Sequence, residues 1–258
     1  MHAHIVLAHP EPQSFNAHLA QVARRALEAE GWSAAVSDLY AMGFDPCERA
    51  EHYVARQRPE RFDVQAEQRH ASERGTIPPI VAAEIDRLER ADLLILQYPM
   101  WWHLPPAMLK GWLDRVFIFG AVYASQKRFE KGRFVGKRAL LSVTVGTSAE
   151  TYAFDGRSGD IDLLLWPVNF SLAYVGYAVL SPFVAYGVEA GLRYSEASVI
   201  EVRLKRIEQD LVDALKSLDQ RATIPFNRMA EWGANGRITA AAAIHSPFIR
   251  RKQRLELE

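Results

Sequence analysis

Residues 92–98 have the sequence DLLILQY, a run of large apolar side chains that ends at Pro99. An apolar run of this length, bounded by a proline, is typical of a strand buried on both faces of a parallel sheet. Residues 5–8 and residues 138–145 have the same character. We therefore expect residues 92–98 to form the central strand of a sheet that is covered on both sides.

Helical patterns alternate with these strands along the chain. Over residues 15–30, apolar side chains recur at three- and four-residue intervals, with Ser14 as a candidate N-cap and Gly31 as a candidate stop. We expect further helices at residues 81–91, 105–117, 160–174 and 195–218, and further strands at residues 32–39 and 178–186. This alternation predicts an α/β fold, a doubly wound parallel sheet with helices on both faces.

Two stretches lie outside the alternation. Residues 45–79 are heavily charged and lack apolar periodicity, so we expect a long excursion over the surface. The residues after Thr223 include too few large apolar side chains to form a core of their own. We therefore divide the chain into a main domain at residues 1–222 and a C-terminal extension or tail at residues 223–258.

The composition argues against several classes of function. The 258 residues include 31 Lys+Arg and 31 Asp+Glu, so no net field favours nucleic acid as a partner. Cys47 is the only cysteine and no Cys/His cluster has zinc-site spacing, so we expect no metal site and a reducing, cytoplasmic compartment. No apolar run approaches the roughly 20 residues that cross a bilayer, and the N-terminus lacks signal-peptide features.

Parallel α/β sheets bind ligands at the carboxyl ends of their strands, which directs attention to three loops. The first, HPEPQSFN at residues 9–16, precedes a helix whose free backbone N–H groups favour a phosphate. Ser14 and Asn16 fit plain helix caps equally well. The glycine fingerprints of dinucleotide and ATP loops are absent, which disfavours those two modes of phosphate binding.

The second and third loops are richer in functional side chains. YPMWWHLPP at residues 98–106 places two tryptophans and His103 after the central strand. Buried aromatics usually belong to a core, but a pair at this position suits a flat conjugated ligand. VGTSAETY at residues 145–152 offers a glycine, small hydroxyls and a phenol, although a simple turn would look similar. The edge that all three loops share strengthens each hypothesis.

Together these stretches resemble the NAD(P)H:quinone oxidoreductases of the DT-diaphorase type, flavoproteins with a flavodoxin-like fold. The resemblance covers residues 3–190 and continues more loosely to the end. Its strings are LAHPEPQSFNAHL at 7–19, SDLYAMGFDP at 37–46, ADLLILQYPMWWHLPPAMLKGWLDRVF at 91–117, LLSVTVGTSAETYAFDGRSGD at 140–160 and LLWPVNF at 164–170. In combination, YPMWW and PPAMLKGWLDRVF are specific.

The resemblance implies two-electron reduction of quinones by NAD(P)H through ping-pong hydride transfer, with FAD rather than FMN as cofactor. It implies a homodimer in which Tyr123 closes the substrate pocket of the partner subunit. Carried over by position, the phosphates and ribityl chain would be held by His9, Ser14, Phe15 and Asn16. The ring would lie along Pro99, Met100, Trp102 and His103, and its polar edge would meet Thr144, Gly146, Thr147 and Tyr152.

Three positions depart from the family's pattern and bear on its proton chemistry and acceptor range. Ser158 stands where the mammalian-type enzymes have a histidine, six residues beyond the catalytic tyrosine, Tyr152. Ser125 replaces a second pocket tyrosine, and His103 replaces a phenylalanine. We expect Tyr152 and Ser158 at the catalytic centre and Tyr123, Ser125 and Trp102 around the substrate, with His103 as an alternative source of the missing imidazole.

Two other functions fit the same pattern. A nitro or azo reductase would use the same flat slot, because a flavin slot discriminates acceptors poorly. A redox-sensing regulatory flavoprotein beside a cation-efflux system would dock its partner through the C-terminal extension, which contains Arg250, Arg251, Lys252 and Arg254. Short charge runs of this kind are more often solvated surface features.

Overall fold

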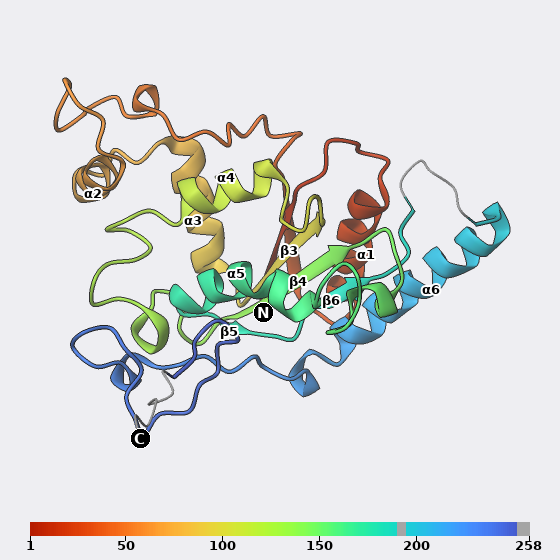
Figure 1. Ribbon diagram of the computed structural model, residues 1–258. Coiled ribbons are helices and arrows are strands. Elements are labelled where there is room, and N and C mark those ends of the chain that lie inside the picture. Colours follow the sequence, from red (N-terminus) through yellow and green to blue (C-terminus); the bar gives the residue numbers. More distant parts are fainter. Residues whose placement is uncertain (190–194, 252–258) are drawn as a thin grey trace, which may run out of the picture.

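A computed structural model describes residues 1–189 and 195–251, and its centre is a parallel sheet with helices on both faces (Figure 1). The strands are β1 (His2–Leu7), β2 (Ser33–Asp38), β3 (Leu93–Pro99), β4 (Arg138–Thr144), β5 (Ala178–Val179) and β6 (Phe183–Ala185). They lie in the order β2-β1-β3-β4-β5, with β6 also paired to β4. The predicted doubly wound α/β fold is confirmed.

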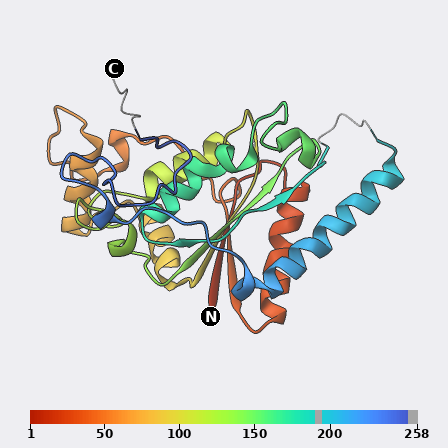
Figure 2. The same ribbon diagram turned by 60° about the horizontal axis from the view of Figure 1, so that its bottom comes forward.

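Helices α1 (Phe15–Ala29) and α6 (Ala197–Lys216) cover one face of the sheet (Figure 2). Helices α3 (Pro79–Arg90), α4 (Ala107–Val116) and α5 (Ile161–Tyr174) cover the other face, and α2 (Val64–Arg74) lies beyond α3 and α4. Short 3₁₀ turns are η1 (Ala50–His52), η2 (Phe129–Lys131), η3 (Ala149–Tyr152), η4 (Leu218–Gln220) and η5 (Met229–Glu231). Helices α1, α3, α4, α5 and α6 each pack apolar side chains toward the sheet, which gives two separate core layers.

The register of the three central strands brings their carboxyl ends to one edge. Leu7 of β1 pairs with Gln97 of β3, and Gln97 pairs with Ser142 of β4. Every residue of β3 is buried, as expected for the central strand of a doubly covered sheet. Strand order reverses between β1 and β3, and such a switch point opens a crevice where ligands bind.

The predicted single strand at residues 178–186 is instead two short strands, β5 and β6. Between them, the Ser181 N–H donates to the Ala222 carbonyl at 2.8 Å instead of to β4. Pro182 has no N–H to donate, and the Arg221 guanidinium donates to the carbonyls of Ser181 and Pro182 at 2.5 and 2.6 Å. The strand is interrupted because the chain after α6 returns to pair with this edge.

The predicted surface excursion at residues 45–79 contains a helix that the sequence analysis did not predict, because the segment is so highly charged. Helix α2 is capped by the Asp63 side chain, and its residues Glu67 and Gln68 are buried. The Glu67 carboxylate accepts the backbone N–H groups of Gln57 and Arg58 at 2.8 and 3.1 Å. The periodicity was invisible because the buried face of α2 is polar and hydrogen-bonded rather than apolar.

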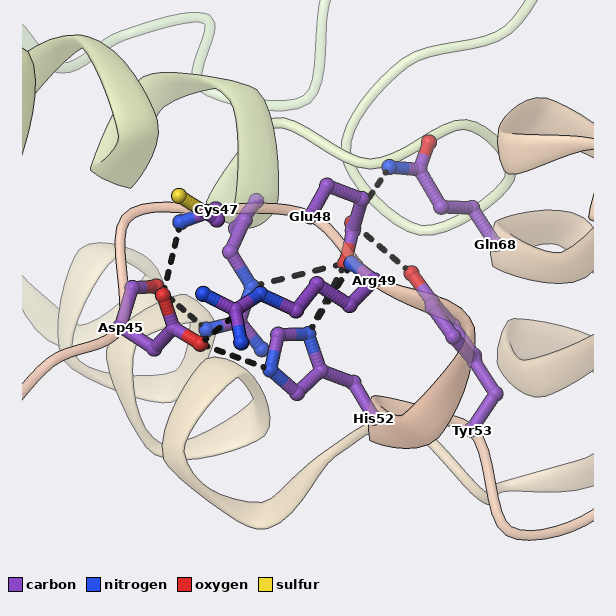
Figure 3. A network of polar contacts seen from close by, with 8 residues as sticks. Asp45, Cys47, Glu48, Arg49, His52, Tyr53 and Gln68 are labelled. Atoms are coloured by element: carbon purple, nitrogen blue, oxygen red, sulfur yellow. Dashed lines mark hydrogen bonds and ion pairs between the residues drawn. The ribbon is translucent and has the colours of Figure 1, made fainter.

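A polar network joins this excursion to α4 (Figure 3). The Glu48 carboxylate accepts from the Tyr53 hydroxyl at 3.0 Å and from Gln68 Nε2 at 3.2 Å. Arg115 of α4, which is buried, donates from Nη1 to the Asp45 carbonyl at 2.6 Å. Burial and the Glu48 carboxylate raise the pKa of the Tyr53 hydroxyl, which keeps it a hydrogen-bond donor.

The described part of the C-terminal extension packs on the α5 side of the molecule. The Ile224 N–H donates to the Val179 carbonyl at 2.8 Å, and the rings of Phe226 and Trp166 lie 4.9 Å apart. Arg250 and Arg251 are exposed, whereas Lys252 and Arg254 lie outside the described residues. The domain division at residue 222 stays a prediction. Within residues 1–189 and 195–251, no helix is both long and apolar enough to cross a membrane.

A charged group, Glu84 of α3, lies in the apolar layer under the sheet with no exposed surface. Its carboxylate accepts from Trp112 Nε1 and from the Ser37 hydroxyl, each at 2.8 Å, and it also contacts Arg87. Burial by itself raises the pKa of Glu84, but the bonds from His4, Ser37 and Trp112 outweigh it and lower the pKa to about 2.

This pKa predicts acid-sensitive stability. Since the folded-state pKa of about 2 lies below the ordinary 4.5, ionised Glu84 stabilises the fold fully above pH 4.5, and its contribution is lost as the pH falls toward 2. We expect Glu84→Gln to lower the free energy of unfolding at pH 7 by about 1–3 kcal/mol and to flatten its decline in acid. Urea unfolding at several pH values measures both.

The control is Asp86→Asn on the same helix, where an exposed carboxylate pairs with Arg90. Exposed pairs contribute little, so this variant should unfold like the parent protein at every pH. An acid decline in Glu84→Gln as steep as that of the parent would contradict the assignment of the effect to Glu84.

Candidate functional site

The first predicted loop ends at a helix start that is open to an anion. The Ser14 side chain caps α1 by accepting the Ala17 N–H at 3.1 Å, which confirms the capping interpretation of this residue. His9 Nδ1 accepts the Glu11 N–H at 3.0 Å, which closes the loop on itself. The first turn of α1 contains no acidic residue, and its positive end favours a phosphate, although the Glu11 carboxylate accepts the Gln13 N–H at 2.8 Å just before the cap.

The second loop is a tight turn with a strained backbone. Trp101 and Leu104 exchange two backbone hydrogen bonds of 3.0 Å each. Between them, Trp102 and His103 have φ of 51° and 62°, the left-handed region that bulky residues rarely adopt. The Trp102 side chain is 93% exposed, so it is not a core residue. A strained turn that presents an indole to solvent is typical of a ligand contact.

The third loop brings Tyr152 and Ser158 into one compact unit. The Ser158 N–H donates to the Thr151 carbonyl at 3.0 Å, so the chain folds back on η3. Glycine is required at position 156, because a Cβ there would lie 2.4 Å from the Thr151 oxygen. At Gly146, at the start of the loop, the Val188 carbonyl, at 3.8 Å, is the one neighbour that a Cβ would meet among residues 1–189 and 195–251. A ligand can therefore approach this backbone closely.

Tyr186 stands beside Tyr152, with ring centroids 6.3 Å apart. Burial, followed by the carboxylates of Asp162 and Asp160, raises the pKa of Tyr186. Tyr186 therefore stays protonated and can donate a hydrogen bond near neutral pH. Sequence reasoning missed this residue, because it follows β6 at the far side of the edge and belongs to none of the three loops.

Direct contacts hold the three loops together at the carboxyl edge. The rings of His9 and Trp101 lie edge to face at 5.9 Å. The Met100 N–H donates to the Thr144 carbonyl at 2.9 Å, and Asn16 Nδ2 donates to the Thr144 hydroxyl at 2.9 Å. Asn16 and Thr144 are buried, so both lie beneath the loop surface.

Asn16 has a second partner that the sequence analysis did not single out. Gln97 Nε2 donates to the Asn16 carbonyl oxygen at 2.9 Å. In the run DLLILQY, Asp92 and Tyr98 stand at the two ends, and Gln97 is the one polar side chain between them. That isolated polar side chain within a buried strand is the signal that could have found it.

Two hollows continue the site toward α6. One of about 840 Å³ lies beside residues 146–150 and is also lined by Tyr186 and Arg203. Arg203 donates to the Gly187 carbonyl and to Glu189, both at 3.0 Å, which ties residues 187–189 to α6. The other, of about 500 Å³, lies between Phe15 and α6. Both volumes are typical of small-molecule sites.

Tyr123 and Ser125 lie away from this edge. The Tyr123 ring packs edge to face on Tyr174, at the last residue of α5, and its hydroxyl accepts from Gln65 Nε2 at 3.3 Å. It lines a hollow of about 640 Å³ between α2, α4 and α5, which also reaches Leu104 and Pro105 of the second loop. Tyr152 lies before the start of α5, and a helix of 14 residues is about 20 Å long. One chain alone therefore does not bring Tyr123 to Tyr152.

Comparison with known proteins gives consistent matches. The family described as having a flavodoxin-like fold matches residues 1–211. The chain is 42% identical to NAD(P)H dehydrogenase [quinone] 1 of Cavia porcellus over 186 residues, 71% of this chain and 68% of that one. It is 38% identical to the Rattus norvegicus protein of the same name over 206 residues, 79% and 75% of the two chains.

Solved structures agree with these relatives. A structure described as a quinone reductase from Klebsiella pneumoniae has a TM-score of 0.80 and 35% identity, and covers 90% of this chain and 91% of its own. An NAD(P)H:quinone oxidoreductase from Methanothermobacter marburgensis has a TM-score of 0.60 and 25% identity, covering 85% and 96%.

The turn geometry predicts the behaviour of a Trp102 variant. Asparagine tolerates the left-handed conformation better than tryptophan, and the exposed indole contributes no core packing. We expect Trp102→Asn to keep or raise the melting temperature of the ligand-free protein while weakening binding of the predicted flavin or acceptor about tenfold. Thermal unfolding and flavin titration measure the two effects. Loss of stability with unchanged binding would show that the indole is structural.

Proposed function

The chain belongs to the flavodoxin-like family of NAD(P)H:quinone oxidoreductases, and on that premise we propose that it reduces quinones with electrons from NAD(P)H at a bound flavin. The observation that supports this most is the meeting of three loops at the switch point between β1 and β3. Together they offer an open helix N-terminus, an exposed indole and a close backbone approach at Gly146. These are the groups that a phosphate, a flat ring and its polar edge need.

We propose FAD rather than FMN as the flavin. The loops alone would serve a mononucleotide, but the two hollows beside α6 provide further volume beyond them. Arg203, which lines the larger hollow, is suited to an adenylate phosphate because guanidinium groups bind phosphate oxygens well. In this arrangement Ser14 and the backbone N–H groups of Phe15 and Asn16 would hold the phosphates, while the Asn16 side chain stays bonded to Gln97 and Thr144, and Thr147 would lie beside the cofactor.

The flavin, when bound, supplies the chemistry by accepting hydride from NAD(P)H and passing it to a quinone in the same slot. Met100 and Trp102 would form the surface on which the flat groups stack, and Pro99, buried at the end of β3, would support the turn that carries them. The Tyr152 phenol donates a hydrogen bond to the oxygen that gains negative charge, and Thr144 and Gly146 support the same polar edge. Ser158 can donate a hydrogen bond but, unlike a histidine, cannot hold a proton near neutral pH.

We further propose that the active unit is a homodimer with shared sites. Tyr123 and Ser125 lie about one helix length from Tyr152, so they can serve the substrate only across a subunit boundary. The hollow that Tyr123 lines is mainly apolar, with Leu113, Phe117 and Phe170 among its walls. A second copy that covers it would bury this surface and place Tyr123 beside the other flavin.

The proposed chemistry is tested by flavin release and by transient kinetics. We expect purified protein to release FAD, identified by mass, and to oxidise NAD(P)H with a quinone as acceptor faster than with a nitroarene. Stopped-flow reduction of the flavin should slow about 100-fold in Tyr152→Phe, the cost of losing one donor to developing charge. Ser158→Ala should leave the rate nearly unchanged.

Different results would exclude parts of this scheme. A chain that neither contains nor accepts flavin would remove the proposed function. Flavin reduction at the parent rate in Tyr152→Phe would remove the role of the phenol. If His103→Phe abolished a pH dependence near neutrality that Ser158→Ala retained, His103 would be the proton-holding group instead.

The shared site predicts complementation between two impaired variants. Co-expression of Tyr152→Phe and Tyr123→Ala chains creates heterodimers in which one of the two sites contains both native tyrosines. With random pairing, about a quarter of all sites are intact, so we expect about a quarter of parent activity. Each variant expressed alone is the control. A fully active monomer in sedimentation, or no recovery in verified heterodimers, would contradict the shared site.

A further inference from the structure

A chain of buried side chains runs beneath the three loops. Gln97 of β3 donates from Nε2 to the Asn16 carbonyl oxygen, and Asn16 Nδ2 donates to the Thr144 hydroxyl, each at 2.9 Å. All three residues are buried, with exposed fractions of 1%, 4% and 3%. The chain joins the end of β3, the start of α1 and the end of β4 at one point, and each of these elements borders a different loop.

These residues, together with the neighbouring Ser142, lie in a layer that is mostly apolar. The sheet face around them is formed by side chains such as Ile5, Ile95 and Leu140, packed against α1 and α6. The side-chain oxygen of Gln97, Oε1, is buried there without a hydrogen-bond partner among the described residues, which carries a desolvation cost. A methionine or leucine at position 97 would avoid that cost, so stability of the fold does not explain the amide.

The direction of the hydrogen bonds suggests what the amide does. Because the Thr144 hydroxyl accepts from Asn16, its own hydrogen remains free for another acceptor. Asn16 can donate in this way only while its carbonyl oxygen faces Gln97. Gln97 thus selects the orientation of the Asn16 amide, and that orientation leaves Thr144 as a donor at the carboxyl edge.

We propose that Gln97 is a positioning residue of the flavin site, acting through Asn16 to set the Thr144 hydroxyl as a hydrogen-bond donor to the cofactor. The inference rests on the proposed flavin function and adds a residue to it. Gln97 itself lies one layer below the loops and touches no substrate. Backbone bonds reinforce the arrangement, since the Ala8 N–H donates to the Gln97 carbonyl at 3.1 Å and Met100 is tied to Thr144.

The first test removes the amide while conserving its length. In Gln97→Met, we expect the dissociation constant of FAD, measured by quenching of flavin fluorescence on titration of apoprotein, to rise about tenfold. The melting temperature of the apoprotein should stay equal or rise. The matched control is Ser142→Ala. Ser142 is the residue of β4 opposite Gln97 in the sheet register, and its buried hydroxyl has no hydrogen-bond partner among the described residues. Its FAD affinity should equal that of the parent.

A second variant, Gln97→Glu, tests the proposal through the pH dependence of FAD binding. A carboxyl group buried at position 97 has a raised pKa and, while protonated, can donate to Asn16 as the amide does. We expect Gln97→Glu to bind FAD like the parent at low pH and like Gln97→Met once the carboxyl ionises, between about pH 5 and 9. A change that acted only through packing would show no such pH dependence.

A double-mutant cycle tests whether Gln97 acts through Thr144. If it does, Thr144→Val combined with Gln97→Met should bind FAD no more weakly than the worse single variant, because both break the same chain. Additive losses would overturn the proposal, as would parent affinity in Gln97→Met or a pH-independent Gln97→Glu. If the parent protein itself binds no flavin, the proposed function fails. If the parent binds FAD and the Gln97 variants bind it with the same affinity, the positioning role fails and the proposed function stands.

Discussion

Everything at the candidate site depends on the parallel register of β1, β3 and β4. Leu7 pairs with Gln97 and Pro99 with Thr144, so β3 and β4 end together, two residues beyond the end of β1. A shift of one residue in β3 would turn Gln97 to the opposite face and break its bond to Asn16. Such a shift would also move the polar Gln97 side chain into the apolar layer under the other face, without its Asn16 partner, and this cost helps to specify the register.

Buried polar groups supply precision that the apolar layers alone lack. Under one face of the sheet, Glu84 collects hydrogen bonds from Ser37 and Trp112 and so ties α3 to β2 and α4. Under the other face, Asn16 joins β3 to β4 from the start of α1. An apolar contact would tolerate small displacements of these elements, whereas a hydrogen bond of 2.9 Å weakens steeply when it is lengthened or bent.

The candidate site could be predicted from the sequence in its location but not in its geometry. Placement of loops after buried strands indicated the carboxyl edge, and the contacts between His9 and Trp101 and between Asn16 and Thr144 are consistent with it. Local sequence did not reveal that Trp102 occupies a left-handed turn with its indole in solvent. Nor did it reveal Tyr186, Arg203 or Gln97, since their relevance arises from strands and helices distant along the chain.

Local patterning by itself determined the alternation of strands and helices, because apolar periodicity reflects which faces an element buries. It therefore also determined the α/β class and the edge where ligands bind. Tertiary structure alone decided that the last strand is split at Pro182, because the interruption depends on Arg221 returning from beyond α6. Tertiary structure alone also decided that α2 packs through buried polar side chains, because Glu67 and Gln68 accept hydrogen bonds from residues that no local pattern indicates. The separation of Tyr123 from Tyr152 is likewise tertiary, since the length of α5 sets it in space.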